Sequence, residues 1–265
     1  FVVSILLLWA IISKQLFQLL PNAWQWPVLR AFCMSIAYTC FYASLSFAAL
    51  SEASACFFTA PIFVCLFAKL FLKESIGIWR LTAIIFGFIG AIIIIQPGFS
   101  NFRPILVLPV MAGAVYAVGV IITRGKCRNE PSFSLTIVHN IFYTCLGAFA
   151  ITFIPLIQFD YYTVAKNAFL LQGWVPLSQS IIFLIGITSL THIVAFTASI
   201  RAYQTVETTI IVPIEYSYLL FAAIIDYFFW HFVPSLTHII GAFFILGSGL
   251  TISWREWNSR TICQK

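Results

Sequence analysis

The carboxylate of Glu215 lies near the middle of residues 208–226, an apolar stretch long enough to cross a lipid bilayer. A carboxylate at that depth is costly unless it faces water or a partner, so Glu215 is a candidate functional group. Pro213 removes a backbone donor at the same depth and loosens the helix there. This combination is typical of binding sites in the middle of a membrane. The alternative is a structural carboxylate held by a neighbouring Tyr, Thr or His.

The composition excludes a soluble globular domain. The chain has 265 residues, of which 62% are hydrophobic and only 8% are charged, and its mean hydropathy is +1.01. Soluble domains carry roughly a quarter of their residues as charged ones. The class that remains is an all-α polytopic membrane protein. The net charge of +6 is scattered over short loops, which excludes a nucleic-acid partner, and the seven cysteines show no metal-binding spacing.

The sequence divides into nine apolar segments, each near the roughly 20 residues that a bilayer requires. Most of the joints between them are short and polar, whereas residues 158–176 form the one long connection. The chain begins at Phe1 inside an apolar run, which predicts a truncated start. The segments are 1–13, 29–50, 53–72, 77–96, 104–124, 132–157, 177–200, 205–228 and 235–254.

The basic residues predict the orientation of these segments. If the first segment ends in the cytoplasm, twelve of the 14 Lys and Arg residues lie on the cytoplasmic side, and only Arg103 and Lys166 lie outside. This bias is a strong positive-inside signal. It predicts a cytoplasmic C-terminus. A parent with both ends in the cytoplasm would have one more helix before residue 1, which makes ten.

The two halves share an order of features. Small residues precede Pro61 in one half and Pro213 in the other, and each half continues with a polar hairpin and a glycine-containing helix. Pro61 enters a segment that runs toward the cytoplasm, whereas Pro213 enters one that runs away from it. Two similar halves of opposite orientation predict an inverted repeat with a site between them. Chance similarity between apolar segments is the alternative.

Five stretches, at residues 50–64, 71–74, 87–98, 212–216 and 241–250, resemble the EamA-type transporters of the drug/metabolite transporter superfamily. The resemblance implies two inverted five-helix repeats. It places the first, N-terminally truncated repeat at 1–97, the second at 104–254 and a cytoplasmic tail at 255–265. One departure is His231, which stands where the family usually has a glutamate. We interpret His231, like Glu74 in the first half, as an end cap of a hairpin.

The expected substrate site combines residues of both halves. Glu215, Tyr216 and Pro213 contribute from one half, and Phe57, Thr59 and Pro61 from the other. His192, Tyr42 and Tyr116 are expected to line the walls, although small and hydroxyl residues also serve as ordinary packing between membrane helices. The glycine pairs Gly87/Gly90 and Gly247/Gly249 are interpreted as close-packing devices.

The sequence contains no signature of a hydrolase, a metalloprotease or a nucleotide-driven pump, so we expect no enzyme and no cofactor. The resemblance implies a secondary transporter that works by alternating access in a bacterial inner membrane. Its substrate would be a small polar metabolite: an amino acid, a cofactor such as riboflavin or S-adenosylmethionine, or a drug. Membrane lipid and a coupling proton or ion are the other expected partners. The alternative is a receptor or scaffold that transports nothing.

Overall fold

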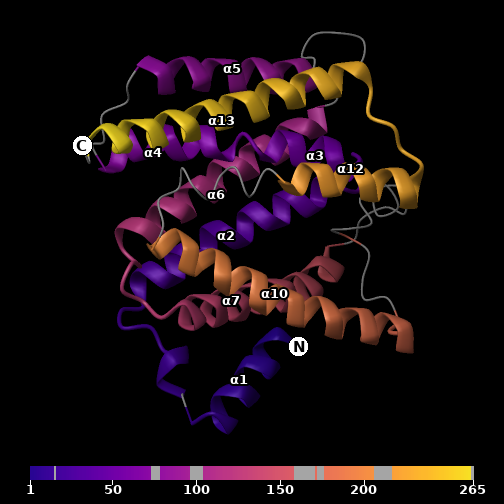
Figure 1. Cartoon of the computed structure of the whole chain (residues 1–265). Helices are drawn as coiled ribbons and strands as arrows, with labels where there is room; N and C mark the ends of the chain where they lie inside the picture. The colour runs from indigo at the N-terminus through magenta and orange to yellow at the C-terminus, as the bar shows by residue number, and fades with distance from the viewer. Residues whose placement is uncertain are drawn as a thin grey trace. The chain divides into compact units, whose positions relative to one another are not determined.

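The computed structural model describes residues 1–14, 16–72, 78–95, 104–157, 171, 176–205 and 217–263. All regular structure in these residues is helical (Figure 1). The elements are α1 (Val2–Ile12), η1 (Leu16–Leu19), α2 (Gln25–Ser44), α3 (Leu50–Phe57), α4 (Ala60–Leu72), α5 (Ile78–Ile95), η2 (Pro104–Leu106), α6 (Val107–Gly125), α7 (Ser132–Phe153), η3 (Ile154–Leu156), α10 (Gln179–Thr205), α12 (Ser217–Trp230) and α13 (Leu236–Cys263).

The helices are as apolar as a membrane requires. Within the described residues, 4 stretches are long and apolar enough to span a bilayer: Leu50–Phe71, Pro104–Gly125, Ser132–Phe153 and Gln179–Thr205. Shorter apolar helices accompany them. A bilayer offers backbone groups no water, so spanning segments satisfy those groups within helices. The predicted fold class, an all-α polytopic membrane protein, is confirmed. The α13 helix continues to Cys263, beyond the predicted segment end at residue 254.

The described chain forms two compact units that interleave along the sequence. Unit 1 comprises residues 1–35 and 122–205, and unit 2 comprises residues 36–121 and 206–265. Each unit therefore draws on both halves of the sequence. The predicted repeat boundaries concern similarity along the sequence rather than compactness, and they stay a prediction.

Unit 1 is built around α1, α7 and α10. Its hydrophobic core contains Leu6, Ala10, Leu19, Ala31, Ile137 and Val138. The loop between α6 and α7 is held by Gln204, whose Nε2 atom donates to the carbonyl oxygens of Cys127 and Glu130 at 2.8 Å each. The Glu130 carboxylate in turn accepts hydrogen bonds from the backbone N–H groups of Asn22, at 2.7 Å, and Ala23, at 3.2 Å. This loop therefore fixes the chain that leads into α2.

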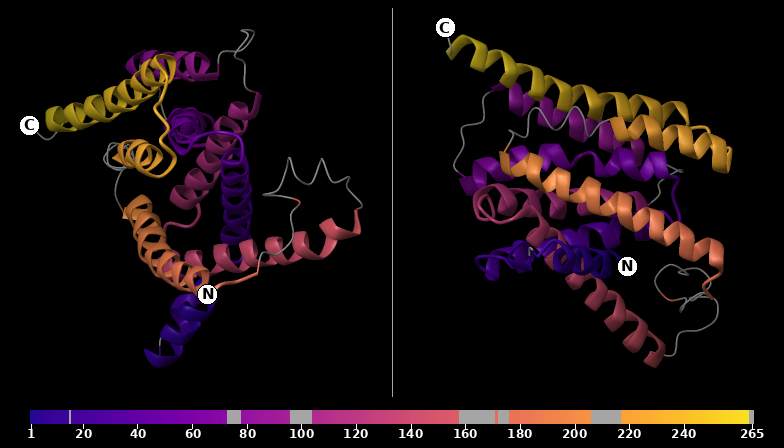
Figure 2. Two further views of the ribbon diagram at one scale, coloured as in Figure 1. Left: turned by 90° about the vertical axis from the view of Figure 1, so that its right-hand side faces the viewer. Right: turned by 60° about the horizontal axis from the view of Figure 1, so that its bottom comes forward.

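Unit 2 contains the end of α2, most of α6, and α3, α4, α5, α12 and α13. The views of Figure 2 show α5 and α13 side by side. They meet at Gly90 and Gly241, where a Cβ atom on either glycine would lie 2.6–2.7 Å from the carbonyl oxygen of the other. Gly87 is equally confined by Ile62 and Ser248. The packing role of Gly87 and Gly90 is thus as predicted.

The close-packing role predicted for Gly247 is not seen, because no atom lies within 4 Å of its Cβ position. Gly241 makes the close approach to α5 instead.

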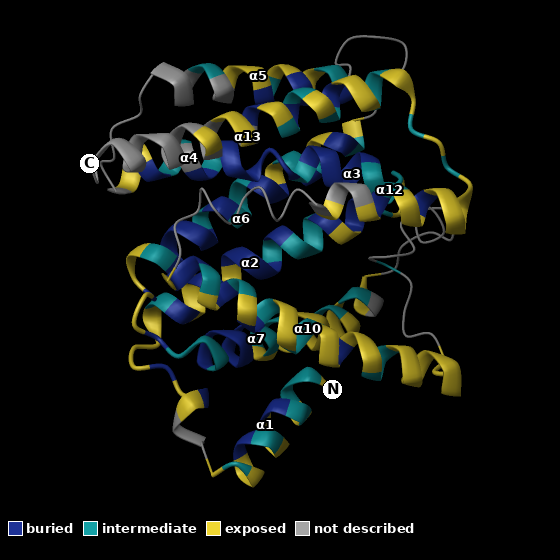
Figure 3. Ribbon diagram, in the orientation of Figure 1, coloured by how far each residue is buried: buried dark blue, intermediate teal, exposed yellow. Residues whose placement is uncertain are grey.

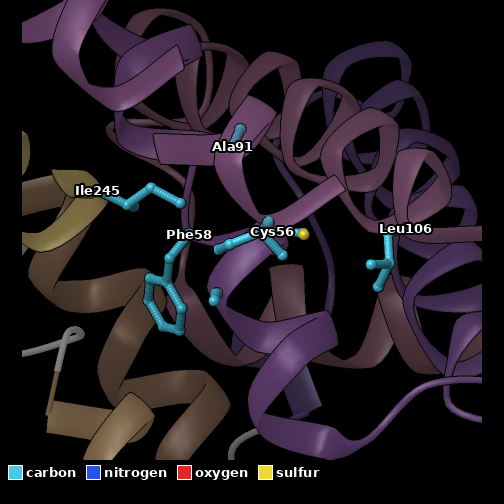
Figure 4. Packing of buried hydrophobic residues seen from close by; sticks show 7 residues of the cluster. Cys56, Phe58, Ala91, Leu106 and Ile245 are labelled. Atoms are coloured by element: carbon cyan, nitrogen blue, oxygen red, sulfur yellow. The ribbon is translucent and has the colours of Figure 1, made fainter. Parts of the chain in front are cut away.

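A dense core lies beside this crossing. Cys56 and Phe58 of the α3 end lie with Ala91, Leu106 and Ile245 in one buried cluster (Figure 4). The last of these side chains comes from α13 and has no exposed surface. The end of α3 is therefore held between helices that are far apart in the sequence.

Backbone geometry also marks the end of α12. His231 has a positive φ of 51°, and the N–H of Phe232 donates to the carbonyl oxygen of Asp226 at 3.1 Å. A left-handed residue just past a helix is a common helix end. His231 therefore closes α12 through its backbone, in line with its predicted place at the end of a hairpin.

Candidate functional site

Three of the predicted site residues, Pro213, Glu215 and Tyr216, lie outside the described residues. Their contribution stays a prediction. The described part of the predicted site lies in α2, α3, α4 and α6 of unit 2, and His192 lies in unit 1.

The apolar span Leu50–Phe71 is broken near its middle. The α3 helix ends at Phe57 and α4 begins at Ala60. Because Pro61 has no N–H, it cannot donate the helical hydrogen bond that the carbonyl of Phe57 would otherwise accept. Thr59 stabilises the break, since its Oγ1 donates to the carbonyl oxygen of Cys56 at 2.8 Å while its side chain is fully buried. The chain thus changes from one helix to the next just before this proline.

The α6 helix passes directly against this break. A Cβ atom on Gly113 would lie 2.7 Å from the carbonyl oxygen of Phe57 and 3.3 Å from the backbone nitrogen of Ala60. A side chain at position 113 would collide with backbone, so glycine is required there by the close approach of the two segments. The same contact covers the carbonyl that Pro61 leaves without its helical donor.

Aromatic rings cluster around the break. The ring centre of Phe57 lies 5.2 Å from that of Phe41 and 5.4 Å from that of Tyr116. Tyr38 is 6.4 Å from both Tyr42 and Tyr116. Three predicted site residues, Tyr42, Phe57 and Tyr116, therefore belong to one aromatic cluster, together with Tyr38 and Phe41. Thr59 and Pro61 adjoin it at the break.

This cluster combines apolar ring faces with polar hydroxyl groups. Ring faces carry negative electrostatic potential, so they attract planar rings and organic cations. Tyr42 is 45% exposed, whereas Phe41 is 7% exposed. The cluster thus has a buried base and an accessible edge, which suits it to contact a small molecule with a planar or cationic group.

Buried carboxylates anchor the start of α3. Asp226 of α12 is 2% exposed, and its carboxylate accepts hydrogen bonds from the N–H groups of Leu50, at 3.2 Å, and Ser51, at 2.6 Å. Glu52 accepts from the N–H of Ala49 at 3.3 Å, and its other oxygen lies 2.9 Å from Nε2 of His238. Negative charge at a helix N-terminus is favourable. This arrangement ties the start of α3 to α12 and α13.

In unit 1, His192 lies on α10 among aromatic and polar neighbours. Its ring stacks on that of Phe196, with centres 5.0 Å apart, and Phe196 also stacks on His139 at 4.8 Å. The Nδ2 atom of Asn140 lies 3.4 Å from Nε2 of His192. The guanidinium of Arg30 lies 5.6 Å from the centre of the Phe196 ring.

Sequence reasoning missed some members of these clusters. Tyr38 lies four residues before Tyr42 and shares its face of α2, which the sequence itself indicates. Phe41 is the residue next to Tyr42 and lies on a different face, so its spacing gives no such signal. Gly113 carried a weaker signal, a glycine in the middle of an apolar segment. The anchoring role of Asp226 and His238 had none, since it depends on which helix ends come together.

Comparison with known proteins supports a common origin with membrane transporters. Residues 1–96 match the model of the EamA-like transporter family. An S-adenosylmethionine uptake transporter of Rickettsia bellii (strain RML369-C) is 27% identical over 229 residues, which are 86% of this chain and 72% of that protein. The pseudopaline exporter CntI of Pseudomonas aeruginosa (strain UCBPP-PA14) is 26% identical over 232 residues, covering 85% of this chain and 74% of the exporter.

Two further matches extend this result. A riboflavin transporter of Brucella anthropi is 36% identical over 90 residues, which are 34% of this chain and 32% of that protein. A protein crystal structure is similar in fold, with a TM-score of 0.53 and 15% identity over 95% of this chain and 83% of that one. The chain is thus similar to EamA-like transporters over residues 1–96, and to two curated membrane transporters over more than four fifths of its length.

Proposed function

We propose that this protein is a secondary transporter that moves a small polar metabolite across a bacterial inner membrane by alternating access. The family match over residues 1–96 and the transporter relatives support transport over a receptor or scaffold role. The relatives include an uptake transporter and an exporter, so both directions of flux are tested below. The distribution of Lys and Arg supports a cytoplasmic C-terminus.

The broken span beside the aromatic cluster is the observation that carries this proposal. Breaks in spanning helices occur where the backbone lines a site or a water-filled path, because lipid cannot satisfy the released backbone groups. Here the break at Phe58 and Thr59 adjoins the rings of Phe57 and Tyr116. The break therefore adjoins a ring cluster with one exposed member, Tyr42.

The aromatic cluster favours substrates with a planar ring or an organic cation. S-adenosylmethionine carries both an adenine ring and a sulfonium, and riboflavin carries a flat ring system. Either is attracted to aromatic faces. These two compounds are therefore the first candidate substrates. Glu215 would add either a counter-charge for a cationic group or a carrier for a coupling proton.

The proposal is tested by metabolite profiles of cells that express the wild type, a Tyr116→Leu variant or a Phe243→Leu variant. Phe243 is a matched control, because its side chain is 76% exposed on α13, away from the cluster. We expect a compound whose cellular level changes with the wild type and the control but not with Tyr116→Leu. Identical profiles in all three strains would contradict transport through this cluster.

A further inference from the structure

Two polar side chains of unit 1 face each other in the middle of apolar spans. Asn140 lies in the span Ser132–Phe153, and His192 is at the centre of the span Gln179–Thr205. Amide and imidazole groups are costly at such depth unless protein, water or a ligand satisfies them. The partners of each polar atom therefore decide what the pair can bind.

The hydrogen bonds fix which atoms of Asn140 and His192 are engaged. The Nδ2 atom of Asn140 donates to the carbonyl oxygen of Thr136 at 2.9 Å and lies 3.4 Å from Nε2 of His192. The carbonyl of Thr136 can only accept, so the amide nitrogen must face it. Since Nε2 of His192 then faces an amide donor, the neutral imidazole carries its proton on Nδ1.

One acceptor and one donor are left over. Among the described residues, neither Oδ1 of Asn140 nor Nδ1 of His192 has a protein hydrogen-bond partner. Both side chains are half-buried. The pair thus presents an acceptor oxygen and an N–H donor. A hydrophobic lipid chain satisfies neither of them.

Neighbouring rings hold the imidazole in place. His192 and Phe196 stack with an interplanar angle of 17°, and His139 stacks on Phe196 at 29°. Because the stacked rings restrict rotation of the imidazole, its N–H is presented in a defined direction. This arrangement is a preformed recognition edge rather than a mobile polar side chain.

We propose that the Asn140–His192 pair binds the edge of a planar heterocycle or amide in which an N–H group adjoins a ring nitrogen or a carbonyl oxygen. The N–H would donate to Oδ1 of Asn140, and the neighbouring acceptor would receive the proton on Nδ1 of His192. Amino-substituted purines and cyclic imides have this edge, whereas aliphatic amines and simple sulfonium groups do not. This inference rests on the proposed transport function and specifies its substrate class.

Equilibrium binding to the full chain in detergent tests the pairing. The probes are adenosine and riboflavin, each compared with an analogue whose edge N–H groups are methylated: N6,N6-dimethyladenosine and 3-methylriboflavin. The variants are Asn140→Leu and His192→Phe, and the latter keeps an aromatic ring to stack on Phe196. Thr191→Val is the matched control, since the Thr191 hydroxyl bonds only to carbonyls of its own helix.

We expect the wild type and Thr191→Val to prefer the unmethylated form of a probe about tenfold, which corresponds to one hydrogen bond. Asn140→Leu should reduce this preference to about one while still binding the methylated analogue. His192→Phe removes the donor to the neighbouring acceptor, which both forms of a probe keep, so this variant should bind both forms about tenfold more weakly. The ratio is measured within each preparation, so a loss of folded protein cancels. An unchanged preference in Asn140→Leu, unchanged affinities in His192→Phe, or no binding of any probe to the wild type would overturn the inference. Binding without flux in liposomes would instead overturn the transport function and leave the recognition edge intact.

Discussion

The two units differ in how far their spanning helices are buried. Two spans belong mainly to unit 2, Leu50–Phe71 and Pro104–Gly125. In their most apolar parts, 59% and 50% of the residues are buried. The corresponding shares for Ser132–Phe153 and Gln179–Thr205 of unit 1 are 28% and 22%. Figure 3 shows the same contrast, with exposed residues running along α10. Exposed apolar side chains on such spans suit contact with lipid.

The contrast shows two ways of holding helices together in one chain. Unit 2 relies on close backbone approach, at Gly90 with Gly241 and at Gly113 with the α3–α4 break. Membrane helices gain stability from such packing because lipid supplies little hydrophobic driving force between them. In unit 1, Gly147 and Gly186 make no such approach, and polar ties of Gln204 and Glu130 join neighbouring segments. Substitutions at glycines should therefore separate the units.

The largest expected effect on stability is that of Gly90→Ala. The new methyl group would lie 2.6 Å from the carbonyl oxygen of Gly241 and 2.9 Å from Ile245, so α5 and α13 must move apart. We expect a loss of about 3 kcal/mol in unfolding free energy, typical of severe overpacking. SDS-titration unfolding followed by circular dichroism measures it.

Gly186→Ala in α10 is the matched control, because no atom lies within 4 Å of its Cβ position. Alanine is a better helix former than glycine, so this variant should be unchanged or more stable by up to about 1 kcal/mol. Equal destabilisation by both substitutions would contradict the claim that only unit 2 relies on close packing at glycines.

Polar ties should matter in both units. Asp226→Ala removes the acceptor for the N–H groups of Leu50 and Ser51, and Glu130→Ala removes that for Asn22 and Ala23. Each substitution leaves two backbone donors without their partner, so we expect a loss of about 2 kcal/mol in either case. The same SDS titration measures both. A loss confined to Glu130→Ala would mean that packing alone holds α3 in place.

The smallest effect is a change in reactivity at the α6–α7 loop of unit 1. Burial, together with the nearby Glu130 carboxylate, raises the pKa of the Cys127 thiol from 9.0 to about 11, and the Arg30 charge offsets this only in part. At pH 8 the thiolate fraction is therefore about a hundredfold lower than in the unfolded chain. Alkylation by iodoacetamide of a variant whose only cysteine is Cys127 should accelerate about tenfold per pH unit up to about pH 11. A plateau near pH 9 would show that the loop opens readily.

Sequence patterns predicted the helical membrane fold because apolar segment length is set by the bilayer itself. Pro61 is itself a sequence signal for the break, because it lacks the N–H group from which the carbonyl of Phe57 would accept a helical hydrogen bond. The interleaved units could not be predicted in this way, because periodicity describes each helix and not its neighbours. Gly241 illustrates the limit: Gly247 looked equivalent in sequence, but only Gly241 faces the α5 backbone.

The candidate site was predictable in part. Tyr42, Phe57 and Tyr116 were predicted site residues because aromatic residues in membrane spans mark either interfaces or sites. In the structure they belong to one chain of ring contacts. The Asn140–His192 edge could not be derived from sequence, because it depends on the register between α7 and α10. The buried contacts of Asp226 and His238 with α3 likewise depend on helix ends that meet only in the folded unit.

The most direct test of the central claim is counterflow in liposomes that contain the purified full chain. The compound is the one whose cellular level separates the wild type from Tyr116→Leu, and the proteins are the wild type, Phe243→Leu, Tyr116→Leu and Glu215→Gln. Transport predicts accumulation of the labelled compound at least tenfold above empty liposomes for the first two proteins. It predicts near-background accumulation for the last two, each with an unchanged yield of inserted protein. Specific binding of the compound by the wild type without any counterflow would contradict the account and identify a receptor.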